Sequence, residues 1–274
     1  MPRACAGALA LLLALAGGAD GAAADGLPGG DLDVVTLNLW HDQRDWPARR
    51  AVILDTLRAL RPDVVLLQEV LEKEGLPNQA GALAESLGCA FVFASVDPPG
   101  APKRYGNAIL TPHRIVASRE LKLEPLDDYR VAAHARLEVR GRTVDAYVTH
   151  LHHTDGGAAV RAAQVRHLLR FVAATRGRGA LVLGGDFNAA PGAPELAPLL
   201  ERFTDAFGAL HPGAAVTTLN PVMGHAPRRI DHVLVPSRGP LRPAAARAVL
   251  ASPGPDGVWA SDHFGLWTRF RWTR

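Results

Sequence analysis

The sequence predicts an α/β (α+β) protein in which two β-sheets pack together and helices cover their outer sides. Short apolar runs rich in β-branched residues recur along the chain, bounded by Gly, Pro or charged residues. Segments with helical spacing of apolar residues separate these runs near both ends of the chain, whereas residues 105–151 are rich in strands. No linker or internal repeat divides the chain after residue 30, so we predict a single domain.

The predicted strands combine β-branched and other apolar residues with polar or turn-forming ends. In chain order they are residues 33–39, 63–69, 89–95, 107–111, 144–151, 180–188 and 230–235. The third of them begins with Cys89, which we expect to pack as a small hydrophobic side chain.

Three segments are predicted helices, at residues 46–60, 156–175 and 192–202. In the first, Pro47 suits the opening turn, and Ile53 and Leu57 recur at helical spacing. The second is amphipathic, with Val165 and Leu168 on its apolar side. Arg161 and Gln164 of this helix are expected to anchor it.

The composition is that of an ordinary globular protein. The 274 residues are 48% hydrophobic and 21% charged, which is enough for one large core. The formal net charge of +3 is spread along the chain without a basic block, so charge alone does not predict a nucleic-acid-binding protein.

The N-terminal segment is typical of a secretory signal peptide. Arg3 precedes the apolar run ALALLLALA, and a small-residue stretch with an Ala22-x-Ala24 site follows. We therefore predict a signal peptide at residues 1–24, a mature domain at residues 25–274, and a secreted or periplasmic location. A retained N-terminal anchor is the alternative. The mature chain would keep Cys89 as its single cysteine, so its stability would come from its core and not from a disulfide.

Polar residues recur at the ends of the predicted strands, where apolar packing does not require them. They are Asn38, Glu69, Asn107, His150, Asp186, Asn188, Asp231 and the pair Asp262-His263. Taken singly, each could be a cap or a turn residue. Together they form a set of carboxylates, amides and imidazoles without a nucleophilic Ser or Cys motif. Such hard oxygen ligands suit Mg²⁺ or Mn²⁺, and the set suits metal-assisted attack of water on a phosphate ester.

The same residues carry a resemblance to a known family. The motifs TLNLW, LLQEV, YGNAIL, THL, GDFNA, RIDHVLV and SDHFGL stand in the order found in the endonuclease/exonuclease/phosphatase superfamily, the DNase I-like metal-dependent phosphoesterases. The resemblance covers about residues 32–272. It implies a four-layer sandwich, with two mixed β-sheets packed face to face, helices on both outer sides, and the site at one edge.

The resemblance also implies roles for individual residues. Metal ligands would be Asn38, Glu69 and Asp262. The catalytic residues would be Asp186, Asn188, His150, Asp231 and His263. Among these, Asp186 would orient or deprotonate the attacking water, and Asp231 would hold His263. The two histidines would donate to phosphoryl oxygens, since a carboxylate partner keeps a histidine protonated. Asn107 would lie on the floor of the site and bind substrate.

Two further features of the sequence leave alternatives open. On a strand His150 and His152 share a face, so we assign His152 to substrate binding; the alternative is a solvated loop histidine, like His153. The segment Asp127–Arg130 is either a turn or a loop that faces the substrate.

The predicted function is that of a secreted Mg²⁺- or Mn²⁺-dependent phosphoesterase that hydrolyses diesters and acts as a monomer without a transmembrane segment. A nucleic acid and a phospholipid headgroup both remain open as substrates. The chain has RIDHV where inositol-polyphosphate 5-phosphatases have a CDR element, which disfavours that branch. Phe264 and Gly265 depart from the pattern of apurinic endonucleases. The alternatives are a catalytically inactive binding module on the same fold and a small-molecule phosphomonoesterase.

Export of the chain is directly testable. Cleavage after Ala24 should give a mature protein that begins at Asp25, because the apolar run is too short to span a bilayer and the residues before the site are small. Mass spectrometry of the protein from the extracellular or periplasmic fraction measures this terminus. An intact Met1 on cytosolic protein would contradict export.

Overall fold

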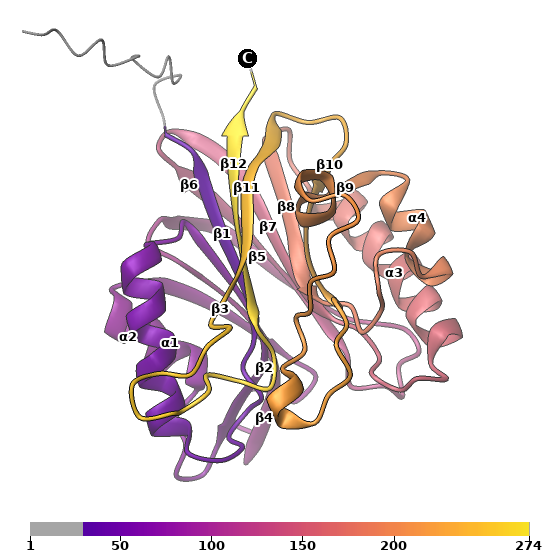
Figure 1. Ribbon diagram of the computed structural model, residues 1–274. Helices are drawn as coiled ribbons and strands as arrows, with labels where there is room; N and C mark the ends of the chain where they lie inside the picture. Colours follow the sequence, from indigo (N-terminus) through magenta and orange to yellow (C-terminus); the bar gives the residue numbers. More distant parts are fainter. Residues whose placement is uncertain (1–29, 274) are drawn as a thin grey trace, which may run out of the picture.

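Two six-stranded β-sheets pack face to face in the computed structural model, which describes residues 30–273 (Figure 1). The first sheet has the order β11 (Leu241–Val249), β12 (Gly265–Trp272), β1 (Leu32–Asn38), β2 (Val64–Lys73), β4 (Lys103–Thr111) and β3 (Ala90–Ser95). The second has the order β5 (Arg114–Lys122), β6 (Val131–Val139), β7 (Arg142–His150), β8 (Ala180–Asp186), β10 (Asp231–Pro236) and β9 (Phe203–Asp205). Both sheets are mixed, because β1–β2 and β7–β8 are parallel pairs among antiparallel ones.

Helices cover the outer sides of both sheets, which confirms the predicted four layers. In Figure 1 α1 and α2 lie on one side of the molecule and α3 and α4 on the other. The helical segments are α1 (Trp46–Leu60), α2 (Gln79–Leu87), α3 (Ala158–Thr175), α4 (Ala197–Leu200), α5 (Ala206–Leu210) and the 3₁₀ turns η1 (Pro194–Leu196) and η2 (Pro221–Met223). Helix α1 begins where Asp45 accepts a hydrogen bond from the backbone N–H of Ala48 at 3.0 Å, with Pro47 in its first turn.

The alternation of side chains along β1 explains the layers. Leu32 and Val34 point into the core between the sheets, whereas Val35 and Leu37 pack in the separate core that includes α1. Because successive strand residues face opposite sides, a strand covered on both sides reads as a continuous apolar run. The same reasoning holds for β8, whose residues are all buried.

All the predicted strands and helices are present, with corrected bounds. The third predicted helix is divided into η1 and α4. Strand β2 does not end at Glu69 but continues to Lys73, with a bulge between Leu67 and Val70. Separate bounds for α2, β5, β6, β9, α5, β11 and β12 were not predicted. Strand β5 is an edge strand with four charged residues in RIVASRELK, and β11 carries Pro243 beside a register shift, so neither shows a clear apolar pattern.

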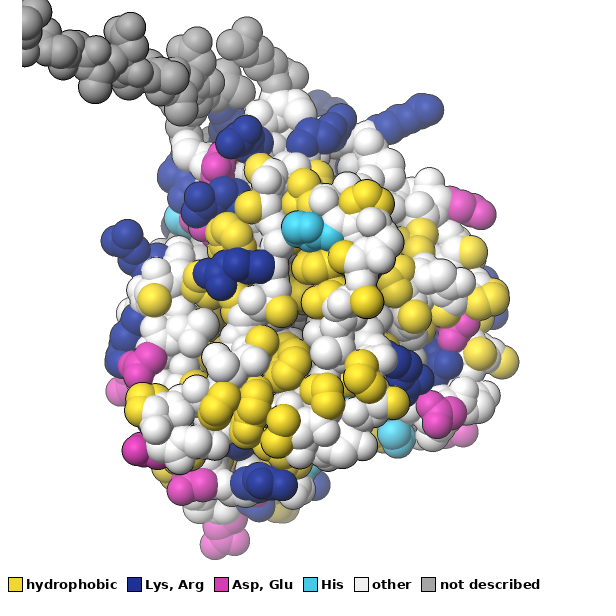
Figure 2. Space-filling view, in the orientation of Figure 1, with side chains coloured by type: hydrophobic (Ala, Val, Ile, Leu, Met, Phe, Trp, Pro, Cys, Tyr) yellow, Lys and Arg dark blue, Asp and Glu magenta, His cyan; other side chains and the backbone are white. Residues whose placement is uncertain are grey.

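The distribution of charged residues on the surface and the length of the helices can be compared with the sequence-based predictions. On the face drawn in Figure 2, Lys and Arg side chains gather around the end of the molecule where the described chain begins and are sparser elsewhere. None of the helices within residues 30–273 is long and apolar enough to cross a membrane. The predicted signal peptide, residues 1–24, lies outside the described residues.

Candidate active site

The candidate site forms where strands of both sheets end next to one another. His150 and Asp186 are the last residues of β7 and β8 and are paired in register, and Asp231, the first residue of β10, pairs with Asp186 from the other side. Asn38 closes β1 in the opposite sheet, and its side-chain Nδ2 donates to Asp186 Oδ2 at 3.1 Å. The face-to-face packing of the sheets therefore brings together side chains that are far apart in sequence.

Asp186 is the centre of this group and is fully enclosed by polar partners. Besides Asn38, the backbone N–H of Asn188 donates to Oδ1 at 2.9 Å, and His150 Nε2 lies 3.3 Å from Oδ2. Burial, together with the negative charge of Asp231, raises the pKa of the Asp186 carboxyl above its ordinary value. A carboxyl shifted in this direction is suited to accept a proton near neutral pH.

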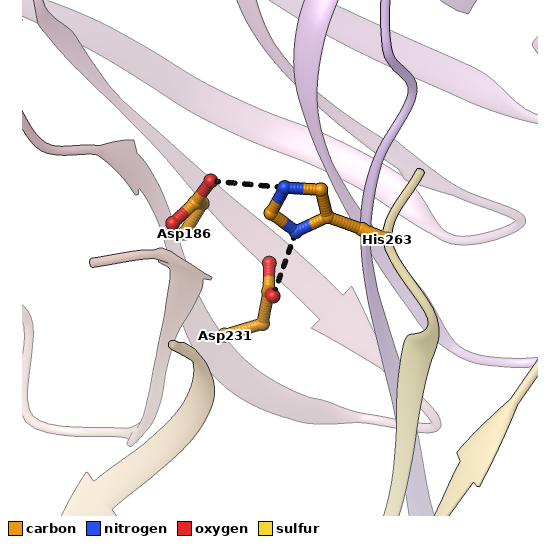
Figure 3. A group of neighbouring side chains, drawn as sticks. All are labelled: Asp186, Asp231 and His263. Carbon is orange, nitrogen blue, oxygen red and sulfur yellow. Dashed lines mark hydrogen bonds and ion pairs between the residues drawn. The ribbon is translucent and has the colours of Figure 1, made fainter. Parts of the chain in front are cut away.

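The imidazole of His263 lies between two buried carboxylates (Figure 3). Its Nδ1 is 2.9 Å from Asp231 Oδ2, and its Nε2 is 3.8 Å from Asp186 Oδ2. Burial alone would lower the pKa of His263, but the charge and hydrogen bond of Asp231, aided by Asp186 and Asp262, raise it to about 10. His263 is therefore a charged donor at neutral pH, as predicted.

His150 differs from His263 and corrects one expectation. Burial, reinforced by the positive charges of Arg130 and His263, holds its pKa well below 6.5. Its Nδ1 is buried without a hydrogen-bond partner. His150 is therefore a neutral imidazole and not a second cationic donor, because the nearby Asp186 does not offset the cost of charging a ring at this depth.

Glu69 lies at the β2 bulge, with its backbone in the left-handed region at φ 56°. A non-glycine residue in this region is strained, and such strain is concentrated at functional sites. The bulge directs Glu69 to a surface pocket that it lines with Tyr105 and Tyr129. Within residues 30–273 no Lys, Arg or His forms an ion pair with Glu69. Its carboxylate therefore has no directly paired cation among the described residues, although Arg49 and His153 interact with it electrostatically.

Asp262 is held at the other side of the site. Its Oδ2 lies 3.1 Å from His225 Nε2, and its Oδ1 lies 3.3 Å from Ser261 Oγ. The Ser261 hydroxyl also donates to the Asn38 carbonyl at 2.7 Å, which fixes the SDH turn against the end of β1. His225, in the loop after η2, was not singled out from the sequence, since a lone His between Gly and Ala carries no motif.

Two amides predicted for the site make hydrogen bonds that shape it. Asn188 Nδ2 donates to the Leu151 carbonyl at 3.0 Å and so ties the GDFN turn to the end of β7. Asn107 Nδ2 donates to the Val131 carbonyl at 2.7 Å, linking β4 of one sheet to β6 of the other. Asn107 lies beside His150 and Arg130, as expected for the floor of the site.

Arg130 is a site residue that the sequence analysis did not identify. It is 2% exposed, yet its Nε and Nη1 have no hydrogen-bond partner, and no carboxylate among residues 30–273 forms an ion pair with it. Its guanidinium lies 4.5 Å from the centre of the Tyr129 ring. The segment Asp127–Arg130, left open between a turn and a substrate-facing loop, therefore delivers a buried cation next to His150.

His152 departs from its predicted role. Both ring nitrogens are engaged within the protein, Nδ1 with Asp128 at 2.9 Å and Nε2 with Thr154 at 2.8 Å, so neither is free for substrate. The strand ends at His150, and the alternation that would give His152 the same face does not continue. Gln164 Nε2 also donates to Asp128 at 2.8 Å. His152 thus helps to fasten the Asp127–Arg130 loop to α3.

The anchoring role predicted for two residues of α3 is confirmed. Arg161 donates to Glu195 at 2.9 Å and to the Thr154 carbonyl at 2.8 Å, and Gln164 Oε1 accepts from the backbone N–H of His152 at 2.8 Å. These bonds hold the loop after β7 against the helix.

Within the described residues, one group of acidic and histidine side chains is close enough to share a metal ion. Asp186, Asp231 and His263 each offer one ligand atom, and these atoms lie within 4.8 Å of one another. A histidine protonated on both nitrogens cannot be a ligand, however, and the raised pKa of His263 indicates that state. In this arrangement the imidazolium ring already occupies the space between the carboxylates.

Residues 35–263 match the Endonuclease/Exonuclease/phosphatase family. Nocturnin of Drosophila melanogaster is 32% identical over 167 residues, which are 57% of this chain and 26% of that protein. The human Nocturnin catalytic domain with bound sulfate is similar in structure, with a TM-score of 0.71, 24% identity, and coverage of 89% of this chain and 95% of that one. D. rerio TDP2 complexed with single-strand DNA product gives a TM-score of 0.74 at 17% identity and covers 88% and 99%.

The state of His263 can be measured by NMR of its ring nitrogens across a pH series. Because its pKa is raised to about 10, the imidazolium form stabilises the fold fully below pH 6.5, and that stabilisation is lost as pH rises through about 10. Asp231→Asn removes the main supporting charge and should move the titration to lower pH. Asp63→Asn, which removes the partner of His113 instead, is the matched control. A His263 ring that titrates near pH 6.5 in the unaltered protein would contradict the assignment.

Proposed function

The chain belongs to the Endonuclease/Exonuclease/phosphatase family, whose members hydrolyse phosphoester bonds, and we propose that it is an exported Mg²⁺- or Mn²⁺-dependent phosphodiesterase. The TDP2 structure, which holds a single-strand DNA product, supports a nucleic-acid substrate, and the sulfate anion in the Nocturnin structure supports an anion site. Export rests on the sequence of residues 1–24 alone.

The observation that carries the proposal is the buried, unpaired guanidinium of Arg130. A buried charge without a partner is costly, so its retention calls for an anion that binds there. The planar guanidinium donates two parallel hydrogen bonds to a phosphate. Arg130 lies beside His150 and Asn107 near the end of β7, which supports a phosphate position close to this strand end.

The groups around Asp186 suit hydrolysis of the bound ester. Asp186 would accept a proton as the oxygen of water forms a new bond to phosphorus and the ester P–O bond breaks, after which the leaving oxygen takes up a proton. His263, charged and held by Asp231, would donate to a phosphoryl oxygen as negative charge develops there. Neutral His150 lies beside this group, with its Nε2 3.3 Å from Asp186 Oδ2.

A divalent cation would be held by oxygen donors beside this cluster. Glu69 is a carboxylate without an ion-pair partner among the described residues, and Asn38 and Asp262 would add further oxygen donors from the end of β1 and the SDH turn. Oxygen donors of this kind select Mg²⁺ or Mn²⁺ over softer metals. When bound, the ion would supply Lewis-acid stabilisation of the phosphoryl oxygens.

The alternative functions predict different results with a panel of substrates. An inactive binding module would bind the ester without turnover, and a phosphomonoesterase would prefer p-nitrophenyl phosphate to bis-p-nitrophenyl phosphate. The pocket beside Glu69 gives room for a second ester arm, which favours a diester. Plasmid DNA, RNA and sphingomyelin, each with Mg²⁺ and with EDTA, complete the panel.

Glu69→Gln should lower Mg²⁺-dependent turnover of bis-p-nitrophenyl phosphate by at least about 100-fold, because it removes the charge of the main oxygen ligand while keeping its size. Initial rates over a range of Mg²⁺ concentrations measure this effect. Glu74→Gln, an exposed carboxylate just beyond β2, is the control and should leave the rates unchanged. Full activity of the Glu69 variant at sub-millimolar Mg²⁺ would refute the metal assignment.

Arg130→Gln should lower kcat/KM for the same diester by about 100-fold or more. Arg130→Lys should lower it less, because lysine keeps the positive charge but lacks the paired N–H donors of the guanidinium. The free energy of unfolding should stay the same or rise, since an unpaired buried charge is removed. Urea unfolding and steady-state kinetics measure the two effects. If Arg130 had only a structural role, the Arg130→Gln variant would be less stable and its kcat/KM would be unchanged.

A further inference from the structure

A surface pocket of about 520 Å³ opens directly beside Glu69. Tyr105 and Tyr129 line it together with His41, and Lys103 and Asp97 lie on its lining as well. The aromatic rings contact one another edge to face, at 6.3 Å between His41 and Tyr105 and 5.9 Å between Tyr105 and Tyr129. This volume is within the range of small-ligand sites and accommodates one nucleotide-sized group.

Tyr129 is an exposed aromatic residue of this pocket. The guanidinium of Arg130 lies 4.5 Å from the centre of its ring, and the residue is 43% exposed. Tyr105 is half-buried, and burial with the nearby charge of Glu69 raises the pKa of its phenol. An exposed tyrosine next to the cation proposed to bind phosphate is well placed to contact the group attached to that phosphate.

The loop that carries Tyr129 is fastened in place. The Tyr129 backbone N–H donates to Asp128 Oδ1 at 2.8 Å, and Asp128 Oδ2 is bound in turn by His152 and Gln164. Fixing the ring before the ligand arrives reduces the entropy lost on binding. The hydrogen bond between His152 and Asp128, which keeps His152 from binding substrate, thus helps to hold the Tyr129 ring at the entrance of the pocket.

We propose that this pocket is a nucleobase subsite, in which Tyr129 stacks on the base of the nucleotide attached to the scissile phosphate and Lys103 contacts an adjacent phosphate. The substrate is therefore a single-stranded nucleic acid or another nucleotide diester with an unpaired base. This inference rests on the proposed phosphodiesterase function and names its substrate class. A base held in a duplex cannot enter a pocket of this size, whereas an unpaired base stacks on aromatic side chains regardless of its identity.

Arg130 already occupies the cation–π position on one face of Tyr129, which disfavours the other common ligand of tyrosine-lined sites, a quaternary ammonium group. The remaining charges of the lining are mixed, with Lys103 beside the carboxylates of Glu69 and Asp97, and do not separate the two ligands. Arg130 behind the ring also attracts the electrons of the ring, as in other cation–π contacts.

The test compares a short single-stranded oligothymidylate with an oligomer of the same length built from abasic spacers. The unaltered protein should prefer the base-containing oligomer by about ten- to a hundred-fold in kcat/KM, the effect of one stacked base. Tyr129→Ala should reduce that ratio to about one, whereas Tyr129→Phe should retain it. Leu126→Ala alters an exposed apolar residue of the same loop outside the pocket lining and is the matched control. Lys103→Gln should make binding of both oligomers less dependent on salt.

Methyl p-nitrophenyl phosphate separates this inference from the function on which it rests. Its metal-dependent hydrolysis, lost in Glu69→Gln, supports the phosphodiesterase whatever the oligomers show. Fluorescence anisotropy of the labelled oligomers in EDTA gives the base preference without turnover and should follow the same order among the variants. Equal use of the two oligomers by the unaltered protein, an unchanged ratio in Tyr129→Ala, or stronger inhibition by phosphocholine than by thymidine monophosphate would overturn the subsite.

Discussion

The arrangement of the site depends on the buried carboxylate of Asp186 and the hydrogen bonds that it accepts. An ionised carboxyl group at this depth is costly unless hydrogen-bond donors surround it. Those donors come from both sheets, as Asn38 reaches across from β1 and the backbone of Asn188 closes from the GDFN turn. Satisfying one carboxylate thus fixes the relative position of strand ends that are separated by 148 residues. A shift of one sheet against the other would leave the charge unpaired, so the apolar packing of the sheets and the chemistry of the site support each other.

A second buried ion, Arg49 of α1, organises the loops that border this contact. Its guanidinium donates to the carbonyl oxygens of Leu39 at 2.7 Å, of Ala260 at 2.9 Å and of His41 at 2.7 Å. Burial lowers the pKa of Arg49 to about 10, which still leaves it charged at neutral pH. Because its partners are backbone carbonyls, it fastens the loop after β1 and the turn before His263 without using any side chain of the site. Its charge also acts on Asp262 and Glu69, two of the predicted metal ligands.

The sequence predicts the layers and most of the site because strands buried on both faces are visible as apolar runs, and a polar residue at the end of such a run stands out. Asp186, Asp231 and His263 were found in this way and meet as expected. Glu69 was placed at a strand end, but it lies at a bulge inside a longer strand and lines a surface pocket, and a bulge leaves no mark in the apolar pattern. Arg130 and Tyr129 were missed as individual residues because they lie in an irregular loop. The fold alone reveals that Arg130 is buried without a hydrogen-bond partner for two of its nitrogens and that Tyr129 is exposed beside it.

The charges of the assembled site explain why its two histidines behave differently. His263 is charged because it lies between carboxylates, whereas burial, reinforced by the charges of Arg130 and His263, keeps His150 neutral. Arg49 interacts electrostatically with Asp262 and Glu69, but its guanidinium donates its hydrogen bonds to backbone carbonyls. In the proposed reaction the positive groups of the protein would face the phosphoryl oxygens, and the carboxylates of Glu69 and Asp262 would attract the metal ion.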